Sequence, residues 1–145
     1  MSLRIAVVDD NADLVESMLD VLHHLGHQAV GATSPSAGLQ LLEDHLPDVA
    51  LIDVSMPGMS GVDVAKHVRG RTWGQGMVLI ALTGWGRAED RDACRDAGFD
   101  HLALKPVDLD YLQVMLERVD ACSPHSVPVA TQGARTGLPC DAARP

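Results

Sequence analysis

Short apolar runs alternate with longer amphipathic segments along the first 120 residues of the chain. Runs rich in β-branched residues are typical of strands, and apolar positions that recur every three or four residues are typical of helices. The pattern predicts strands at residues 4–8, 28–32, 49–52, 77–82 and 102–104. Each strand is followed by a predicted helix, and such cycles imply right-handed crossovers and a parallel sheet between two layers of helices.

The predicted helices differ in how much they offer to a core. The first, second and fifth carry leucines at helical spacing, whereas the fourth, at residues 87–97, offers mainly alanines. The predicted inner faces comprise Leu14, Met18, either Val21 or Leu22, and Leu25, then Ala37, Leu41 and Leu42, then Ala88, Ala93 and Ala97, and finally Leu109, Leu112, Leu116 and Val119. Because alanines bury little apolar area, we expect the fourth helix to shift at low cost.

Polar residues stand at or just after the end of four predicted strands. They are Asp9 and Asp10, Asp53, Thr83 and Lys105. Open α/β sheets build their sites at the carboxyl ends of the strands, so these side chains are expected to converge. Each residue taken alone could be a helix cap or a turn residue. Unrelated caps have no reason to follow strands one, three, four and five in this way, which favours a functional site.

Length and charge narrow the class of protein. The 145 residues suit a single globular domain, which we place at residues 3–120. From Ala121 onward Pro, Ser, Thr, Gly and Ala dominate, so residues 121–145 are expected to form a disordered tail. The formal net charge is −9 and there is no basic stripe, which argues against direct binding to nucleic acid.

Cysteine, histidine and hydropathy patterns argue against several other classes of site. The three cysteines lack the spacing of a disulfide framework, a zinc site or a haem attachment, and they fit a reducing cytoplasm. No apolar run approaches the roughly 20 residues of a membrane helix, so no membrane partner is expected. The histidines at 23, 24 and 27 are interpreted as solvated residues at the C-terminal end of a helix.

Four ordered motifs resemble the receiver domains of two-component response regulators and hybrid histidine kinases. They are Val8-Asp9-Asp10, Leu51-Ile52-Asp53-Val54-Ser55-Met56-Pro57-Gly58-Met59-Ser60-Gly61, Ala81-Leu82-Thr83-Gly84 and Leu104-Lys105-Pro106. The resemblance covers residues 3–120. It implies a flavodoxin-like, doubly wound α/β fold whose five parallel strands follow the order 2-1-3-4-5.

The carboxylates of Asp9, Asp10 and Asp53 would repel one another if they converge, so we expect a cation among them. At roughly 4 Å and an effective dielectric constant near 20, each pair would repel by about 4 kcal/mol. Mg²⁺ suits a few carboxylates together with phosphate oxygens and retained waters. The resemblance implies that Asp10 and Asp53 bind Mg²⁺ directly with the backbone carbonyl of Ser55, and that Asp9 binds it through water.

Asp53 ends the most apolar predicted strand and precedes a Pro-Gly loop, so we assign it as the nucleophile that accepts a phosphoryl group. Lys105 supplies a compact positive charge that can pair with Asp53 at rest. Thr83 offers a hydroxyl donor, and Gly84 lets the backbone come close. The resemblance implies a cis peptide before Pro106 that directs Lys105 into the site.

One position departs from the family pattern. Receivers usually place an aromatic switch residue three positions before the lysine, where this chain has Leu102. Coupling must therefore use other movements. We expect Trp85, two residues after Thr83, and the alanine-rich fourth helix to carry the signal.

The sequence thus predicts a cytoplasmic, non-enzymatic signalling domain that takes a phosphoryl group from the phosphohistidine of a histidine kinase or histidine phosphotransfer protein. Slow self-hydrolysis would reset it. One alternative is a receiver that serves constitutive docking or dimerisation, and a homodimer through the fourth and fifth helices stays open. The other is an Mg²⁺ phosphatase with an aspartyl nucleophile, but Ser55 stands where a second acid would be needed.

Overall fold

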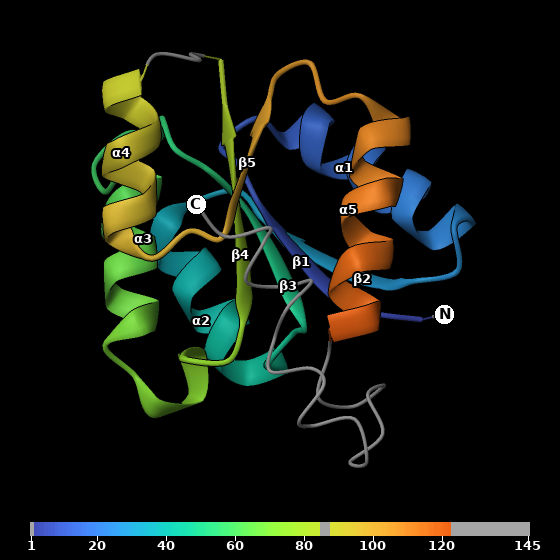
Figure 1. Cartoon of the computed structure of the whole chain (residues 1–145), viewed down its shortest axis with the longest axis horizontal. Helices are drawn as coiled ribbons and strands as arrows, with labels where there is room; N and C mark the ends of the chain where they lie inside the picture. The colour runs from blue at the N-terminus through green and yellow to red at the C-terminus, as the bar shows by residue number, and fades with distance from the viewer. Residues whose placement is uncertain (1, 85–87, 123–145) are drawn as a thin grey trace.

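Five parallel strands form one sheet in the order β2-β1-β3-β4-β5, as predicted (Figure 1). The structure, a computed structural model, describes residues 2–84 and 88–122. The strands are β1 (Arg4–Val8), β2 (Gln28–Ala32), β3 (Val49–Asp53), β4 (Val78–Thr83) and β5 (His101–Leu104). The helices are α1 (Ala12–His24), α2 (Pro35–His45), α3 (Gly61–Arg69), the short 3₁₀ helix η1 (Thr72–Gly74), α4 (Ala88–Ala97) and α5 (Leu109–Cys122).

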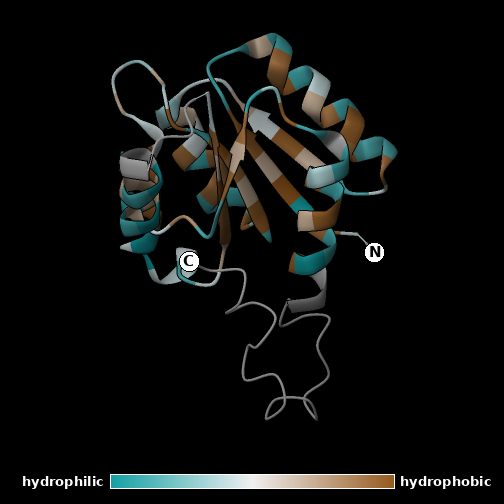
Figure 2. Ribbon diagram, turned by 45° about the horizontal axis from the view of Figure 1, so that its top comes forward, coloured by the Kyte–Doolittle hydropathy of each residue, from teal (hydrophilic) through white to brown (hydrophobic). Residues whose placement is uncertain are grey.

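The sheet separates two apolar clusters because successive side chains of a strand point to opposite faces. In β1, Ile5 and Val7 pack with α1 and α5, whereas Ala6 and Val8 pack with α2, α3 and α4. Every residue of β3 is buried, as expected for a central parallel strand that is covered on both faces. Figure 2 shows the apolar strands enclosed by helices whose outer faces are polar.

Two of the predicted inner faces are corrected by the structure. In α2, Ala37 is exposed and Gly38 is buried instead. The helix lies so close to β1 at this position that a Cβ atom at Gly38 would be 2.6 Å from Cγ1 of Val8. This close approach to β1 sets the rotation of the helix about its axis. In α4, Ala93 is exposed, and Cys94 and Ala97 are the buried residues. Ala88 was also predicted to face the core, but its side chain lies outside the described part of the chain.

The first helix shows a related shift in its inner face. Its buried residues are Val15, Met18 and Leu22, while Leu14 is partly buried. In α5, Leu112, Leu116 and Val119 are buried as predicted. Thus the spacing of apolar residues located these helices correctly but placed the inner face of α1 partly one residue too early.

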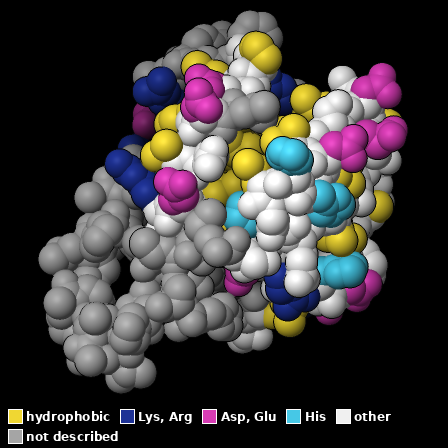
Figure 3. Space-filling model, turned by 90° about the vertical axis from the view of Figure 1, so that its right-hand side faces the viewer, with side chains coloured by type: hydrophobic (Ala, Val, Ile, Leu, Met, Phe, Trp, Pro, Cys, Tyr) yellow, Lys and Arg dark blue, Asp and Glu magenta, His cyan; other side chains and the backbone are white. Residues whose placement is uncertain are grey.

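His27 is buried, with 4% exposure, and the prediction that it is solvated is wrong. Gly26 adopts φ 94° and turns the chain after α1, so His27 enters the core instead of continuing the helix surface. Its Nδ1 accepts a hydrogen bond from the Leu3 N–H at 3.1 Å. His23 and His24 are exposed as predicted. Figure 3 shows several histidine side chains on the face of the molecule that it presents.

The chain enters and leaves the described domain at the same edge of the sheet (Figure 1). β1 begins at the amino edge, and α5 runs back from the carboxyl end of β5 toward that edge. We expected the tail to begin at residue 121, but α5 continues to Cys122, two residues further than the predicted end of the domain at residue 120. Residues 123–145 lie outside the described part, so the disordered tail stays a prediction. Within residues 2–84 and 88–122, none of the helices has the length and apolarity to cross a membrane.

We predict that Gly61→Ala destabilises the fold at the start of α3. A Cβ atom there would lie 2.2 Å from the carbonyl oxygen of Asp53 and 2.8 Å from Cα of Val54, and this backbone cannot move away as a flexible side chain would. We expect urea unfolding to show a loss of about 1–3 kcal/mol in the free energy of unfolding. Gly76→Ala is the matched control, since nothing lies within 4 Å of that position. Equal midpoints for the two variants would contradict the prediction.

Candidate functional site

Three carboxylates from the ends of two neighbouring strands meet at the carboxyl edge of the sheet. Asp9 and Asp10 directly follow β1, and Asp53 ends β3. One oxygen atom of each lies within 4.8 Å of the others, and no other group of three His, Cys, Asp or Glu side chains in the described residues meets this criterion. Asp9 and Asp53 are buried, and Asp10 is exposed. The predicted convergence of the three aspartates is confirmed.

The aspartates are not required as the cap of α1. Asn11 is the N-cap, and its Oδ1 accepts a hydrogen bond from the Leu14 N–H at 3.2 Å. Asp9 supports this turn through its Oδ1, which accepts from the Asn11 N–H at 2.9 Å. Its own backbone N–H donates to the carbonyl of Ala32 at the end of β2. Asp9 is therefore fixed in place by neighbours on both sides.

The loop after β3 fixes the orientation of Asp53. Asp53 Oδ1 accepts a hydrogen bond from the Ser55 N–H at 3.2 Å, and the Gly61 N–H donates to the Val54 carbonyl at 2.9 Å. Ser60 caps α3 and exchanges hydrogen bonds with Asp63 in a capping box. The start of α3 is therefore bound closely to the end of β3, beside the Asp53 carboxylate.

Lys105 reaches from the end of β5 to both buried carboxylates. Its Nζ lies 2.7 Å from Asp9 Oδ2 and 3.2 Å from Asp53 Oδ1. The predicted pairing with Asp53 is present. The shorter contact is with Asp9, which lies 96 residues away in the chain, and it was not predicted. The backbone N–H of Lys105 donates to the Thr83 carbonyl at 2.8 Å. The peptide between Lys105 and Pro106 is cis, as expected.

Burial and neighbouring charges shift the pKa values of Asp53 and Lys105. Burial, followed by repulsion from Asp9, raises the pKa of Asp53 above its usual value, against the lowering effects of the Ser55 N–H and of Lys105. Burial alone would lower the pKa of Lys105. The hydrogen bond to Asp9 and the negative charges of Asp53 and Asp9 outweigh burial and raise it. Lys105 therefore carries its charge at neutral pH.

Thr83 and Gly84, the other two residues predicted for the site, lie at the end of β4. Thr83 is buried at the last position of the strand and is paired in register with Leu104 of β5. Gly84 follows it, and a Cβ atom added there would meet no atom within 4 Å. The protein itself therefore leaves open space beside this backbone.

The residues predicted to carry the conformational signal are partly described. Leu102 is half-buried in β5 and packs against the cluster that includes α4. It therefore connects the strand that precedes Lys105 with the helix that follows Thr83. Trp85 lies outside the described residues, so its assigned role stays a prediction.

Comparisons with known proteins agree with this geometry. The family model of the response regulator receiver domain matches residues 5–117. The chain is 31% identical over 139 residues to the virulence sensor protein BvgS of Bordetella pertussis, covering 92% of this chain and 11% of BvgS. It is 33% identical over 106 residues to the phosphate regulon transcriptional regulatory protein PhoB of Escherichia coli, covering 73% of this chain and 46% of PhoB. The chain thus spans a small part of one relative and less than half of the other.

Solved structures show the same fold. A CheY-like response regulator receiver domain protein from Methanospirillum hungatei superposes with a TM-score of 0.74 at 28% identity, covering 83% of this chain and 95% of that one. The chemotaxis protein CheY4 of Vibrio cholerae superposes with a TM-score of 0.78 at 24% identity, covering 82% and 99%. The family match, the strand order and the convergent aspartates lead to one conclusion: this chain belongs to the response regulator receiver domain family.

Proposed function

We propose that this receiver domain accepts a phosphoryl group on Asp53 from a phosphohistidine of a partner protein, with Mg²⁺ bound beside it, and signals through the resulting conformational change. The observation that supports this most is the contact of Lys105 with two buried carboxylates, Asp9 and Asp53, at the edge where Thr83 also ends its strand. Receiver domains partner with histidine kinases or phosphotransfer proteins, so a donor of this type is proposed here.

The chemistry of the donor set fits Mg²⁺. At separations of up to 4.8 Å and an effective dielectric constant near 20, each pair of ionised carboxylates repels by about 3 kcal/mol or more. Three carboxylates and Lys105 together leave two negative charges, which a divalent cation would balance. We propose that Asp10 and Asp53 bind the ion directly with the backbone carbonyl of Ser55, and Asp9 through water. When bound, the ion would neutralise and orient the phosphoryl oxygens.

The residues of the chain supply the remaining chemistry. A carboxylate oxygen of Asp53 attacks phosphorus, the bond from phosphorus to the histidine nitrogen breaks, and its electron pair stays on that nitrogen. Lys105 then stabilises a phosphoryl oxygen with its ammonium group, and the Thr83 hydroxyl donates to another. The open space beside Gly84 lets its N–H approach the same group. Attack by water on the acyl phosphate would restore Asp53.

The same geometry disfavours the two alternative functions, an Mg²⁺ phosphatase and a constitutive docking module. Ser55, two residues after Asp53, is exposed and offers no carboxylic acid to protonate the leaving group of a phosphomonoester. Burial and Asp9 raise the pKa of Asp53, so this arrangement disfavours the ionised form of its carboxyl group. Docking to a partner does not require such an arrangement. Phosphoryl transfer gives this arrangement a use, since the nucleophile is held beside the groups that stabilise its product.

Intact mass after incubation with acetyl phosphate and Mg²⁺ tests the proposed acceptor. We expect a gain of one phosphoryl group in the native chain and none in Asp53→Asn, because the amide cannot form the acyl phosphate. Asp44→Asn is the matched control, since Asp44 is exposed and contacts Gln40 within α2. Phosphorylation of Asp53→Asn would refute the assignment. No gain in the native chain, together with no stabilisation by beryllofluoride, would refute the phosphoacceptor function.

Magnesium should stabilise the native protein against heat. At about ten times the dissociation constant, a ligand that binds the folded state alone adds about 1.4 kcal/mol to the free energy of unfolding. We expect Asp10→Asn to lose most of this effect, because it removes an exposed carboxylate from the group of three. Asp44→Asn should keep it. An equal rise in melting temperature for Asp10→Asn and the native chain would argue against this metal site.

Without Mg²⁺, Asp53→Asn should stabilise the protein in a pH-dependent way. The pKa of Asp53 is raised in the folded state, so its favourable contribution is complete below the unfolded carboxyl pKa, about 4, and is lost as pH rises through the folded value. Asparagine has no such titration. We expect the two proteins to differ little at acidic pH and the variant to be the more stable of the two at neutral pH. A difference that does not change with pH would contradict this.

A further inference from the structure

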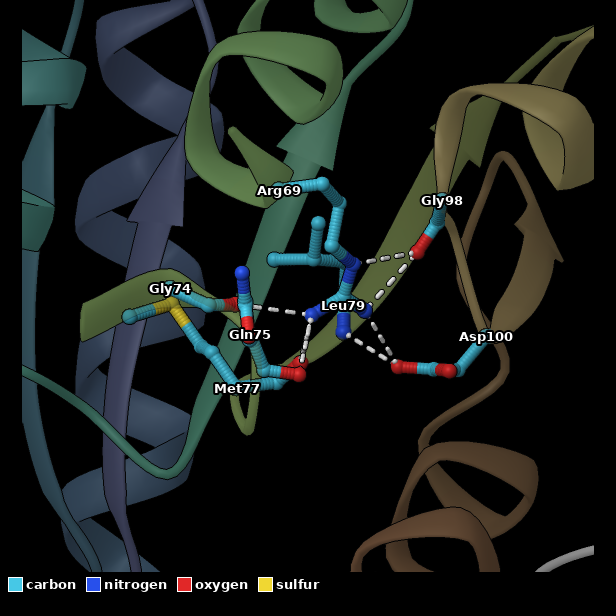
Figure 4. A network of polar contacts seen from close by, with 7 residues as sticks. All are labelled: Arg69, Gly74, Gln75, Met77, Leu79, Gly98 and Asp100. Carbon is cyan, nitrogen blue, oxygen red and sulfur yellow. Dashed lines mark hydrogen bonds and ion pairs between the residues drawn. The ribbon is translucent and has the colours of Figure 1, made fainter. Parts of the chain in front are cut away.

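Arg69, the last residue of α3, joins three segments at the amino edge of the sheet (Figure 4). Its Nη1 donates to the carbonyls of Gly74 at 2.8 Å and Met77 at 2.7 Å, before β4 begins. Its Nε and Nη2 donate to the Gly98 carbonyl at 3.0 and 2.8 Å. Nη2 also pairs with the Asp100 carboxylate at 2.9 Å, before β5 begins. One guanidinium group therefore connects α3 with the approaches to both strands.

Asp100 attaches this network to the sheet. It is 6% exposed, and its Oδ2 also accepts a hydrogen bond from the Leu79 N–H at 3.0 Å. Its own N–H donates to the Leu79 carbonyl at 2.8 Å. Charge-assisted hydrogen bonds from a planar guanidinium are strong and directional. The pair of Arg69 and Asp100 is therefore held against the backbone of β4.

The C-terminal end of α4 is bound to the same arginine. Gly98 has φ +111°, a conformation that favours glycine, and its N–H donates to the Arg95 carbonyl. The Phe99 N–H donates to the Cys94 carbonyl at 3.0 Å. A Cβ atom at Gly98 would lie 2.5 Å from Cγ of Arg69. The side chain of Arg69 thus lies directly against the end of the helix.

The C-terminal half of α4 contacts the core. Within residues 91–97, Cys94 and Ala97 are buried, and Phe99 is buried just after the helix. The helix starts after the carboxyl end of β4, on the side of the Asp53 site, and ends at the amino edge. The half of α4 that is farther from the site therefore has both core contacts and a polar anchor.

We propose that Arg69 is a positioning residue that fixes the C-terminal end of α4 as a pivot. Phosphorylation of Asp53 then tilts the helix about that end instead of sliding it as a whole. The response to phosphorylation rests on the proposed function, whereas the anchor is a property of the unphosphorylated protein. A phosphoryl group acts at the carboxyl edge, and it can shift the helix only through contacts that differ between two arrangements. A fixed far end converts such a shift into rotation.

Amide hydrogen exchange of the unphosphorylated protein tests the anchor. In the native chain we expect the amides of residues 98–100 to exchange about tenfold or more slowly than those of 92–93, because opening them breaks the network around Arg69. Arg69→Lys replaces the planar fork with a single ammonium group. It should speed exchange at 98–100 about tenfold and leave the amide of His27, bonded to the Leu22 carbonyl, unchanged. A general loss of stability would speed all these amides together.

Arg95→Lys is the matched control, because Arg95 pairs with Asp92 in an exposed contact on α4 itself. It should leave exchange at 98–100 unchanged. If Arg69→Lys does not fold, Asp100→Asn provides a second variant, since it removes the ion pair and keeps an acceptor for the Leu79 N–H. Equal exchange at 92–93 and 98–100 in the native chain, or equal effects of Arg69→Lys and Arg95→Lys, would overturn the anchor.

Addition of beryllofluoride and Mg²⁺ tests the pivot. We expect altered exchange at 92–93 and none at 98–100 in the native chain, and a response that extends to 98–100 in Arg69→Lys. A response of equal size at both ends of the native helix would overturn the tilt. If beryllofluoride leaves the melting temperature of both proteins unchanged and acetyl phosphate adds no phosphoryl group to the native chain, the tilt and the phosphoacceptor function both fail. The comparison without beryllofluoride still decides whether Arg69 is the anchor.

Discussion

Charge balance at the carboxyl edge of the sheet is the constraint on which this structure depends. Lys105 extends from β5 past the end of β4 to touch Asp53 on β3 and Asp9 beside β1. One ammonium group cannot neutralise three carboxylates, and burial of two of them strengthens the remaining repulsion. The parallel strands, the short loops after them and the capping of α1 and α3 all hold these groups in this unfavourable arrangement.

The opposite edge has a different physical character. There, side chains bind backbone groups and fix the segments that lead into the strands. His27 accepts the Leu3 N–H, Asp48 accepts the Arg4 N–H at 2.9 Å, and Arg69 donates to several carbonyls. The Leu3 N–H is buried, and without His27 it would lack this partner. The sheet therefore has one edge that is chemically unbalanced and one that is mechanically secured, and α4 runs between them.

The sequence predicted those features of the fold and the site that depend on local patterns of residues. Continuous apolar runs located every strand to within a residue or two, and the three aspartates and Lys105 lie together as expected. Contacts between positions that are distant in the chain leave no such pattern in the sequence, so they were not predicted. Arg69 binds mostly backbone carbonyls, which any residue supplies, and the burial of His27 depends on the turn at Gly26. Likewise, the exposure of Ala93 and the burial of Cys94 follow from the rotation of α4 against its neighbours, which spacing alone does not determine.

The positions of the first strand and the last helix bear on modular architecture. Because β1 begins and α5 ends at the edge opposite Asp53, a linker or neighbouring domain joined at either side would depart from the edge opposite the proposed phosphoacceptor. Within a larger polypeptide, both junctions would thus lie at the far edge of the sheet from Asp53. That layout suits relatives in which the matching segment makes up 11% or 46% of the protein. It also makes the two ends suitable places to fuse a reporter.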